Sequence, residues 1–126
     1  MPFDTLGLAP ELVRVAAEEG YTVSTPIQRQ AIPPILAGRD ILAGAQTGTG
    51  KTAAFAFPIL HLMSQNAAAI RTRKIRALVL TPTRELAAQV DESFKTYGSY
   101  LSFKSFVVFG GVSINVQMEK LRKGCD

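Results

Sequence analysis

The sequence has one cysteine, no tryptophan and no apolar run of the length needed to cross a membrane. The lone thiol of Cys125 cannot form an internal disulfide, and the first residues show neither the basic cluster nor the apolar stretch of a signal peptide. A membrane-spanning helix needs roughly 20 apolar residues in succession. We therefore exclude a disulfide scaffold and a membrane protein, and expect a cytoplasmic protein with no membrane partner.

What the sequence does contain is typical of a folded protein. Apolar residues make up 47% and charged residues 19% of the 126 residues, which is enough for one domain, or a large part of one, with a core. The net charge is +4. This excess is compatible with a polyanionic partner such as RNA, but it does not by itself identify one.

Helical and extended patterns alternate along the chain. Apolar spacing, caps and glycine stops predict helices over residues 10–19, 25–32, 51–65, 83–100 and 113–123. Short apolar runs predict buried strands over residues 40–44, 76–81 and 104–109. This order predicts the α/β class, with a parallel sheet covered by helices on both faces.

Prolines should modify two of these helices. Pro33 and Pro34 should end the helix of residues 25–32, and a short turn stopped by Gly38 should follow. Pro58 should kink the helix of residues 51–65. Between that helix and the next strand, residues 67–74 should form a surface loop.

A glycine-rich loop with a phosphate-binding pattern follows the first predicted strand. The general pattern is Gly, four residues, then Gly-Lys-Ser/Thr, and here Ala45 takes the place of the first glycine. Lys51 should contact the phosphates and Thr52 should ligate Mg²⁺. The alternative is a glycine-rich turn without a ligand. The residues predicted to bind the phosphates are Ala45, Gln46, Thr47, Gly48, Thr49, Gly50, Lys51 and Thr52.

Four segments carry a resemblance to one family. Residues 45–52 (AQTGTGKT) resemble motif I of the DEAD-box RNA helicases, in which alanine at the first position is usual. Residues 20–28 (GYTVSTPIQ) resemble the Q motif, and Phe3 stands where its upstream aromatic is expected. Residues 82–89 (PTRELAAQ) resemble motif Ia, and Gly110-Gly111 resembles the paired-glycine element. The resemblance covers essentially the whole chain and is nearest to the bacterial RhlE type.

The resemblance implies a partial RecA-like P-loop domain, the N-terminal part of the first helicase domain. Residues 1–38 would form its Q-motif region, and residues 39–126 its α/β core up to a point before the Asp-Glu-Ala-Asp box. The parent protein would be an ATP-dependent RNA helicase that hydrolyses ATP with Mg²⁺, and Lys51 and Thr52 would be catalytic residues. By itself the chain should lack unwinding and efficient hydrolysis, and should expose apolar sheet edges.

Adenine recognition is expected from the Q-motif region. The Gln28 amide can accept a hydrogen bond from adenine N6 and donate one to N7. By resemblance, Tyr21 would stack on the base and Phe3 would belong to the same nucleotide site. The alternative is that Tyr21 and Phe3 only anchor the N-terminal helices and that Gln28 is a surface helix residue.

RNA contact is expected from the motif Ia segment and the glycine pair. Pro82, Thr83 and Arg84 would lie at a helix N-terminus, where amides attract phosphate, and Gly110 and Gly111 would allow close approach of the RNA backbone. Such contacts carry no base specificity. The alternatives are a capped helix without a ligand and a plain tight turn.

Other residues receive structural interpretations. His61 should be packed or exposed rather than catalytic. The basic cluster of Arg71, Arg73, Lys74 and Arg76 should be a solvated loop, and the alternative is that it adds non-specific attraction for phosphate. Two rival functions remain: another P-loop ATPase, such as a transport or recombination motor, and an RNA-binding module without enzymatic activity.

Overall fold

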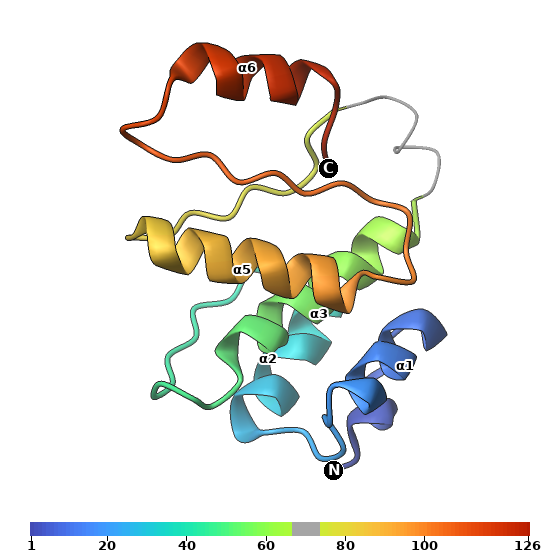
Figure 1. Cartoon of the computed structure of the whole chain (residues 1–126). Coiled ribbons are helices and arrows are strands. Elements are labelled where there is room, and N and C mark those ends of the chain that lie inside the picture. The colour runs from blue at the N-terminus through green and yellow to red at the C-terminus, as the bar shows by residue number, and fades with distance from the viewer. Residues whose placement is uncertain (67–73) are drawn as a thin grey trace.

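The computed structural model describes residues 1–66 and 74–126. Helix α3 lies at the centre and packs between α2 and α5, while η1 and α1 cover one end (Figure 1). Helix α6 lies on the far side of two extended segments, away from α5 (Figure 1). The helices are η1 (Phe3–Leu6), α1 (Pro10–Glu18), α2 (Pro26–Leu36), α3 (Lys51–Ser64), α5 (Arg84–Tyr97) and α6 (Ile114–Arg122).

Helix α2 begins as predicted and ends later than predicted. The Thr25 hydroxyl accepts from the backbone N–H of Gln28, and the Gln28 side chain accepts from the backbone N–H of Thr25. The two bonds form a capping box. The helix then continues through Pro33 and Pro34 to Leu36, so the predicted stop near residue 32 is wrong.

Burial explains why the two prolines do not end α2. A proline in a helix interior costs about 3 kcal/mol. The pair therefore costs about 6 kcal/mol. Ile27 and Ile32 of α2 are both buried and contribute about 1.5–3 kcal/mol each, and the buried Ala31 adds to this. The carbonyls of Pro33 and Pro34 accept from the N–H groups of Ala37 and Arg39, so the last turn closes normally.

The other helices agree with prediction to within about one turn. Pro58 lies inside α3, as expected, and its predicted kink stays a prediction. His61, also on α3, accepts a hydrogen bond at Nδ1 from the Ala9 N–H at 2.9 Å, which confirms its packing role. No helix among residues 1–66 and 74–126 is long and apolar enough to cross a membrane.

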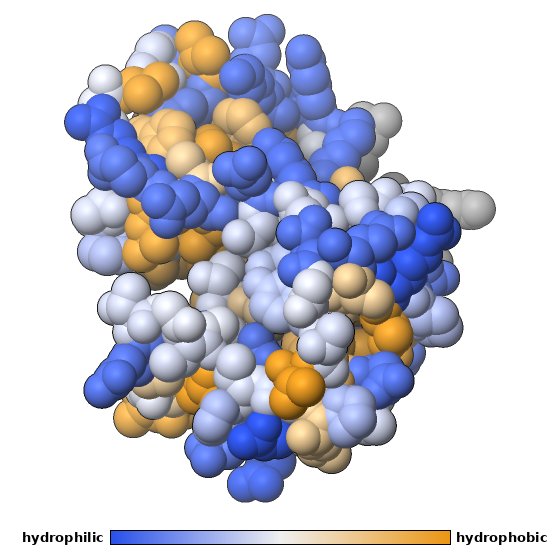
Figure 2. Space-filling view, turned by 60° about the horizontal axis from the view of Figure 1, so that its bottom comes forward, coloured by the Kyte–Doolittle hydropathy of each residue, from blue (hydrophilic) through white to orange (hydrophobic). Residues whose placement is uncertain are grey.

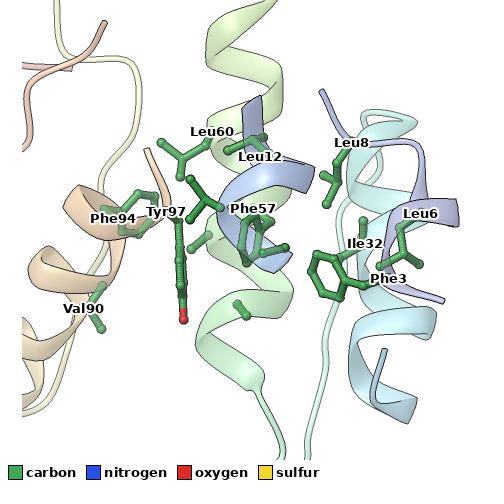
Figure 3. Close-up of a cluster of buried hydrophobic side chains, with 14 residues drawn as sticks. Phe3, Leu6, Leu8, Leu12, Ile32, Phe57, Leu60, Val90, Phe94 and Tyr97 are labelled. Carbon is green, nitrogen blue, oxygen red and sulfur yellow. The ribbon is translucent and has the colours of Figure 1, made fainter. Parts of the chain in front are cut away.

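The core lies among η1, α1, α2, α3 and α5, with Phe57 of α3 near its centre (Figure 3). The Phe57 ring stacks on Tyr97 with 4.4 Å between centroids and meets Phe3 edge-on at 5.2 Å. Offset and edge-on aromatic pairs add about 0.5–1.5 kcal/mol each beyond their buried area. Aromatic packing therefore joins the N-terminus, α3 and α5.

The three predicted strands are extended segments without sheet pairing. Within the described part of the chain, the assigned β pairing is an isolated bridge between Pro2 and Val23. A strand exists only through hydrogen bonds to a neighbouring strand, and the backbones of residues 40–44, 76–81 and 104–109 do not supply these to one another. The strand predictions are therefore not met, and the parallel sheet stays a prediction.

Asp126 joins two of these extended segments. Its carbonyl oxygen accepts from the N–H groups of Arg76 and Ala77, and its own N–H donates to the Lys104 carbonyl at 2.8 Å. Its carboxylate accepts from Arg76 Nη2, also at 2.8 Å, and from the Lys104 N–H. Arg76 is thus a part-buried ion-pair partner, and the prediction of a solvated loop is wrong for it.

The same prediction for Arg71 and Arg73 lies outside the described residues, as does most of the predicted loop of residues 67–74. Apolar side chains reach the surface along the extended segments, and Figure 2 shows such patches between hydrophilic ones. Leu42 is 104% exposed and Leu80 is 85% exposed. Apolar side chains are thus exposed along these described segments, while the predicted apolar sheet edges stay a prediction.

Candidate nucleotide and RNA site

Two glycines shape the phosphate loop through the left-handed backbone region. Gly48 and Gly50 both have a φ of 80°, a conformation that costs other residues about 1–2 kcal/mol. A Cβ on Gly48 would meet no atom within 4 Å, whereas one on Gly50 would lie 2.4 Å from the Gln28 Nε2. Gly48 is therefore needed for its backbone angle, and Gly50 also for the close approach of Gln28.

The loop is closed by its own hydrogen bonds. Lys51 Nζ donates to the Ala45 carbonyl at 2.6 Å, and Thr49 Oγ1 donates to the Gln46 carbonyl, also at 2.6 Å. Lys51 is exposed and opens α3, so its ammonium lies at a helix N-terminus, where anions are favoured. A phosphate oxygen makes a stronger, charge-assisted bond than a carbonyl and can replace Ala45 as the acceptor.

The residues present fit a nucleotide phosphate with a metal ion. Thr52 is half-buried in the first turn of α3, beside Lys51. Among residues 1–66 and 74–126, no group of three His, Cys, Asp or Glu residues could hold a metal. The Thr52 hydroxyl would hold Mg²⁺ together with phosphate oxygens and water, as is usual for this ion. Thr47 is exposed in the same loop.

Gln28 connects α2 to the phosphate loop. Its side chain is fully buried, so the alternative that it is a surface helix residue is wrong. Oε1 accepts from the Thr25 N–H at 2.9 Å, and Nε2 donates to the Gly50 carbonyl at 3.4 Å. An amide has two donor hydrogens and two acceptor lone pairs, so one donor hydrogen and one lone pair are unused. Because the side chain is fully buried, a base would reach them only if the residues around Gln28 moved.

The two predicted aromatic contacts of the nucleotide pack against the core. Phe3 is 2% exposed, and its ring lies 5.6 Å from that of Tyr21. The hydroxyls of Tyr21 and Tyr97 share a hydrogen bond of 2.8 Å. Burial raises the pKa of Tyr97, and the hydrogen bond shared with Tyr21 raises this pKa further. This packing agrees with an anchoring role, while stacking on adenine stays a prediction.

The predicted RNA-binding residues lie where α5 begins. The Thr83 hydroxyl caps α5 by accepting from the Leu86 N–H at 3.2 Å. Pro82 and Arg84 are exposed. A Cβ on Gly111 would lie 3.6 Å from Arg84 Nη1, so the structure places these two predicted sites next to each other.

The site residues therefore form two groups. Gln28 and Gly50 form the first with the rest of the phosphate loop, and Arg84 and Gly111 form the second. Gly111 has a φ of 76°, a conformation that favours glycine, and Gly110 is exposed beside it. No hydrogen bond between described residues joins the loop of residues 45–52 to Arg84 or to the glycine pair.

One residue near the second group was missed by sequence reasoning. Gln117 of α6 is 9% exposed, and its amide bonds the turn that contains the glycine pair. A glutamine seven residues after Gly110 has no distinctive spacing. Only the structure shows that Gln117 is buried while its neighbours on α6 are exposed.

Known proteins identify the family of this sequence. The protein-family model described as DEAD/DEAH box helicase matches residues 25–126. The chain belongs to this family. Membership contradicts the rival interpretation as a transport or recombination motor, and it confirms the resemblance at the level of the family. The RhlE subtype stays a prediction.

The curated relatives are longer proteins. The chain is 45% identical to the DEAD-box ATP-dependent RNA helicase RhpA of Helicobacter pylori, over 96% of this chain and 23% of that protein. It is 46% identical to the ATP-dependent RNA helicase DeaD of Mycobacterium tuberculosis, over 97% of this chain and 21% of that protein. The chain thus spans under a quarter of the length of these two relatives.

Solved structures agree on the fold. A DEAD box protein from Methanococcus jannaschii superimposes with a TM-score of 0.85 at 35% identity, over 96% of this chain and 32% of that one. The RNA helicase Prp28 from Chaetomium thermophilum, bound to ADP, has a TM-score of 0.84 at 37% identity, over 98% and 30%. These neighbours have RecA-like domains, so the likeness to such a domain is confirmed, while the arrangement of the sheet stays a prediction.

Proposed function

We propose that the chain is the nucleotide-binding and RNA-binding part of an ATP-dependent RNA helicase. The observation that carries this proposal is the contact between Gln28 and Gly50, because it joins an adenine-reading amide to a phosphate loop. A phosphate loop alone does not distinguish ATP from other nucleotides. Residues 1–38 would supply base recognition, and residues 39–126 would supply phosphate and RNA contacts.

In this proposal, ATP and Mg²⁺ are the cofactors. Lys51 would exchange its bond to the Ala45 carbonyl for the phosphates, Thr52 would hold the metal, and Gln28 would pair with adenine through its remaining donor and acceptor. The residues that would line the nucleotide with them are Phe3, Tyr21, Gln46, Thr47, Gly48, Thr49 and Gly50. The relative Prp28, which was solved with ADP, supports a nucleotide in this fold.

RNA would bind at the second group through its backbone. Arg84 and the helix N-terminus capped by Thr83 offer positive charge and amides to phosphate, beside the Gly110–Gly111 turn. Contacts of this kind fix the position of the strand without reading its bases. The proposed RNA partner is therefore not restricted in sequence.

Unwinding would belong to the whole protein, acting in the cytoplasm. Hydrolysis needs a carboxylate near the metal and a group that positions the attacking water, and the motifs of this chain supply neither. The chain alone should release phosphate from ATP slowly, even with RNA present. A malachite-green assay measures this, and turnover of about 1 per second or faster, a usual enzyme rate, would contradict the proposal.

Nucleotide binding is tested by titrating ATP and Mg²⁺ into the chain by calorimetry. Lys51→Ala should weaken the binding of ATP at least tenfold, about 1.4 kcal/mol, because it removes a charge-assisted bond to phosphate. Lys74→Ala removes the same charge from an exposed position and should leave the affinity unchanged. Equal affinities in all three proteins would refute nucleotide binding at this loop.

RNA binding is tested by the anisotropy of a labelled single-stranded RNA at several salt concentrations. Arg84→Ala should weaken binding for every sequence tried and lower the salt slope by about 1, because one phosphate contact is lost. Arg14→Ala removes an exposed arginine from α1 and is the matched control. If both variants behave alike, the RNA seat is not at Arg84.

A further inference from the structure

Helix α6 buries one residue, and that residue is polar. Gln117 is the buried member of Ile114–Arg122, at 9% exposure. Its neighbours Val116 and Met118 are 51% and 45% exposed. A helix usually turns an apolar stripe toward the protein, so a buried glutamine flanked by exposed apolar side chains needs a specific reason.

The reason is visible in its hydrogen bonds to the turn that precedes α6. Oε1 of Gln117 accepts from the Phe109 N–H at 2.7 Å. Nε2 donates to the Phe109 carbonyl at 3.1 Å, and lies within 3.3 Å of the Val112 carbonyl and 3.5 Å of the Ser113 carbonyl. The side chain thus holds both ends of the turn that contains the glycine pair, at residues 110 and 111.

A side chain with a donor and an acceptor on the same group is required for this grip. The Phe109 N–H and carbonyl point to one place, and the Gln117 amide bonds both at once. Removing the amide leaves part-buried backbone groups without partners, each at a cost of about 1–3 kcal/mol. The turn would then move toward water or toward other partners.

The position of that turn matters because it faces Arg84. The backbone of Gly111 lies close enough that a Cβ there would stand 3.6 Å from Arg84 Nη1. Gly111 itself has a φ of 76°. A glycine adopts positive and negative φ about equally readily, so its own backbone preference does not hold this conformation. A separate restraint is therefore needed to hold the turn at this distance from Arg84.

We propose that Gln117 is a positioning residue for a phosphate seat formed by Arg84 and the Gly110–Gly111 turn. Its amide clamps the turn at Phe109 and Ser113, so the turn backbone and the guanidinium face the same phosphate. This inference rests on the proposed RNA-binding function. It adds to that function a residue that does not itself touch RNA.

The test compares Gln117→Met with Val116→Met in the 126-residue chain. Methionine keeps the length and helix preference of glutamine but makes none of its hydrogen bonds. Gln117→Met should weaken the binding of single-stranded RNA about tenfold in an anisotropy titration. Its affinity for ATP should equal that of the wild type. Val116→Met places the same residue at an exposed position of the same helix and should change neither affinity.

A double variant separates positioning from general damage. In the Arg84→Ala background, Gln117→Met should cause almost no further loss of RNA affinity, because the seat that it positions is already broken. Additive losses would show that the two residues act separately and would overturn the inference. A loss of ATP binding in Gln117→Met that equals its loss of RNA binding would indicate only structural damage, and would overturn it too.

Two outcomes distinguish a wrong RNA seat from a wrong role for Gln117. If Arg84→Ala binds RNA as the wild type does, the RNA seat itself is wrong, and the inference falls with it. If Arg84→Ala weakens RNA binding while Gln117→Met does not, the seat stands and the role of Gln117 is refuted.

Discussion

Two regions of the molecule are built in different ways. The helical base, which comprises η1, α1, α2, α3 and α5, buries side chains such as Phe57 and Leu60 completely. The extended region, residues 39–50, 74–83 and 101–113, leaves Leu42, Leu78 and Leu80 more than three-quarters exposed. Stability is therefore concentrated in the base, whereas most predicted ligand contacts lie in or next to the extended region.

The difference follows from how each kind of segment satisfies its backbone. A helix makes its own hydrogen bonds, so the base forms once its apolar faces meet. An extended segment needs partners from elsewhere in the chain, and here residues 76, 77 and 104 find one partner in Asp126. The residues predicted to bind the nucleotide lie at the seam, where Gln28 of the base reaches Gly50 of the extended region.

Core truncation should separate the two regions most strongly. Phe57→Ala should lower the free energy of unfolding by about 3–5 kcal/mol, because a fully buried ring is lost and a cavity remains. Leu80→Ala, at an 85% exposed position, should stay within about 0.5 kcal/mol of the wild type. Urea unfolding measures both variants. Similar losses in the two would mean that the extended region carries as much of the fold as the base.

Alanine substitutions at the two loop glycines should differ in how much they lower the free energy of unfolding. Gly48→Ala should cost about 1–2 kcal/mol, because alanine is strained at a φ of 80°. Gly50→Ala should cost about 1–2 kcal/mol more, because its Cβ displaces Gln28 and its hydrogen bonds. Urea unfolding of both variants checks the difference. Equal costs would show that Gln28 does not hold the loop to the base.

Helix caps should differ between the base and α6. Thr25→Ala removes the hydroxyl of a complete capping box and should cost about 1 kcal/mol. Ser113, which precedes α6, makes no cap bond through its side chain, so Ser113→Ala should be close to neutral. Thermal unfolding followed by circular dichroism compares the two. A larger loss for Ser113→Ala would contradict the assignment of stability to the base.

Alkaline pH should loosen the base through Tyr97. Burial raises its pKa in the folded chain above the usual value near 10, so the unfolded chain releases this proton first. The contribution of Tyr97 to the free energy of unfolding is fully present below pH 10. It is lost as pH rises through the pKa of Tyr97 in the folded chain. Urea unfolding between pH 8 and pH 11 should show the fall, and Tyr97→Phe should reduce it. An unchanged slope in that variant would remove Tyr97 as the cause.

Local signals made part of this fold predictable. The helix that starts at Thr25-Pro26 and the glycines of the phosphate loop follow from short-range rules of capping and backbone angle. The continuation of α2 through Pro33 and Pro34 did not follow, because it depends on burial against other helices. A sequence pattern also cannot show whether an apolar run such as residues 76–81 finds strand partners.

The candidate site shows the same division. The residue types of the phosphate loop and of motif Ia point to phosphate without any structure. The contact between Gln28 and Gly50 joins residues 22 positions apart, and the clamp of Gln117 on Phe109 depends on how α6 folds back. Long-range geometry, not residue type, decides these features.

The measurement that tests the central claim most directly is the ratio of ATP to GTP affinity, with Mg²⁺, in the wild type and in Gln28→Ala. Gln28 should favour ATP by roughly tenfold or more, since a bidentate amide–adenine pair is worth about 1–3 kcal/mol, and Gln28→Ala should lose this preference. Thr25→Ala, which breaks the capping box but keeps the amide, should retain the preference. Equal binding of the two nucleotides by the wild type, or an unchanged preference in Gln28→Ala, would contradict the account.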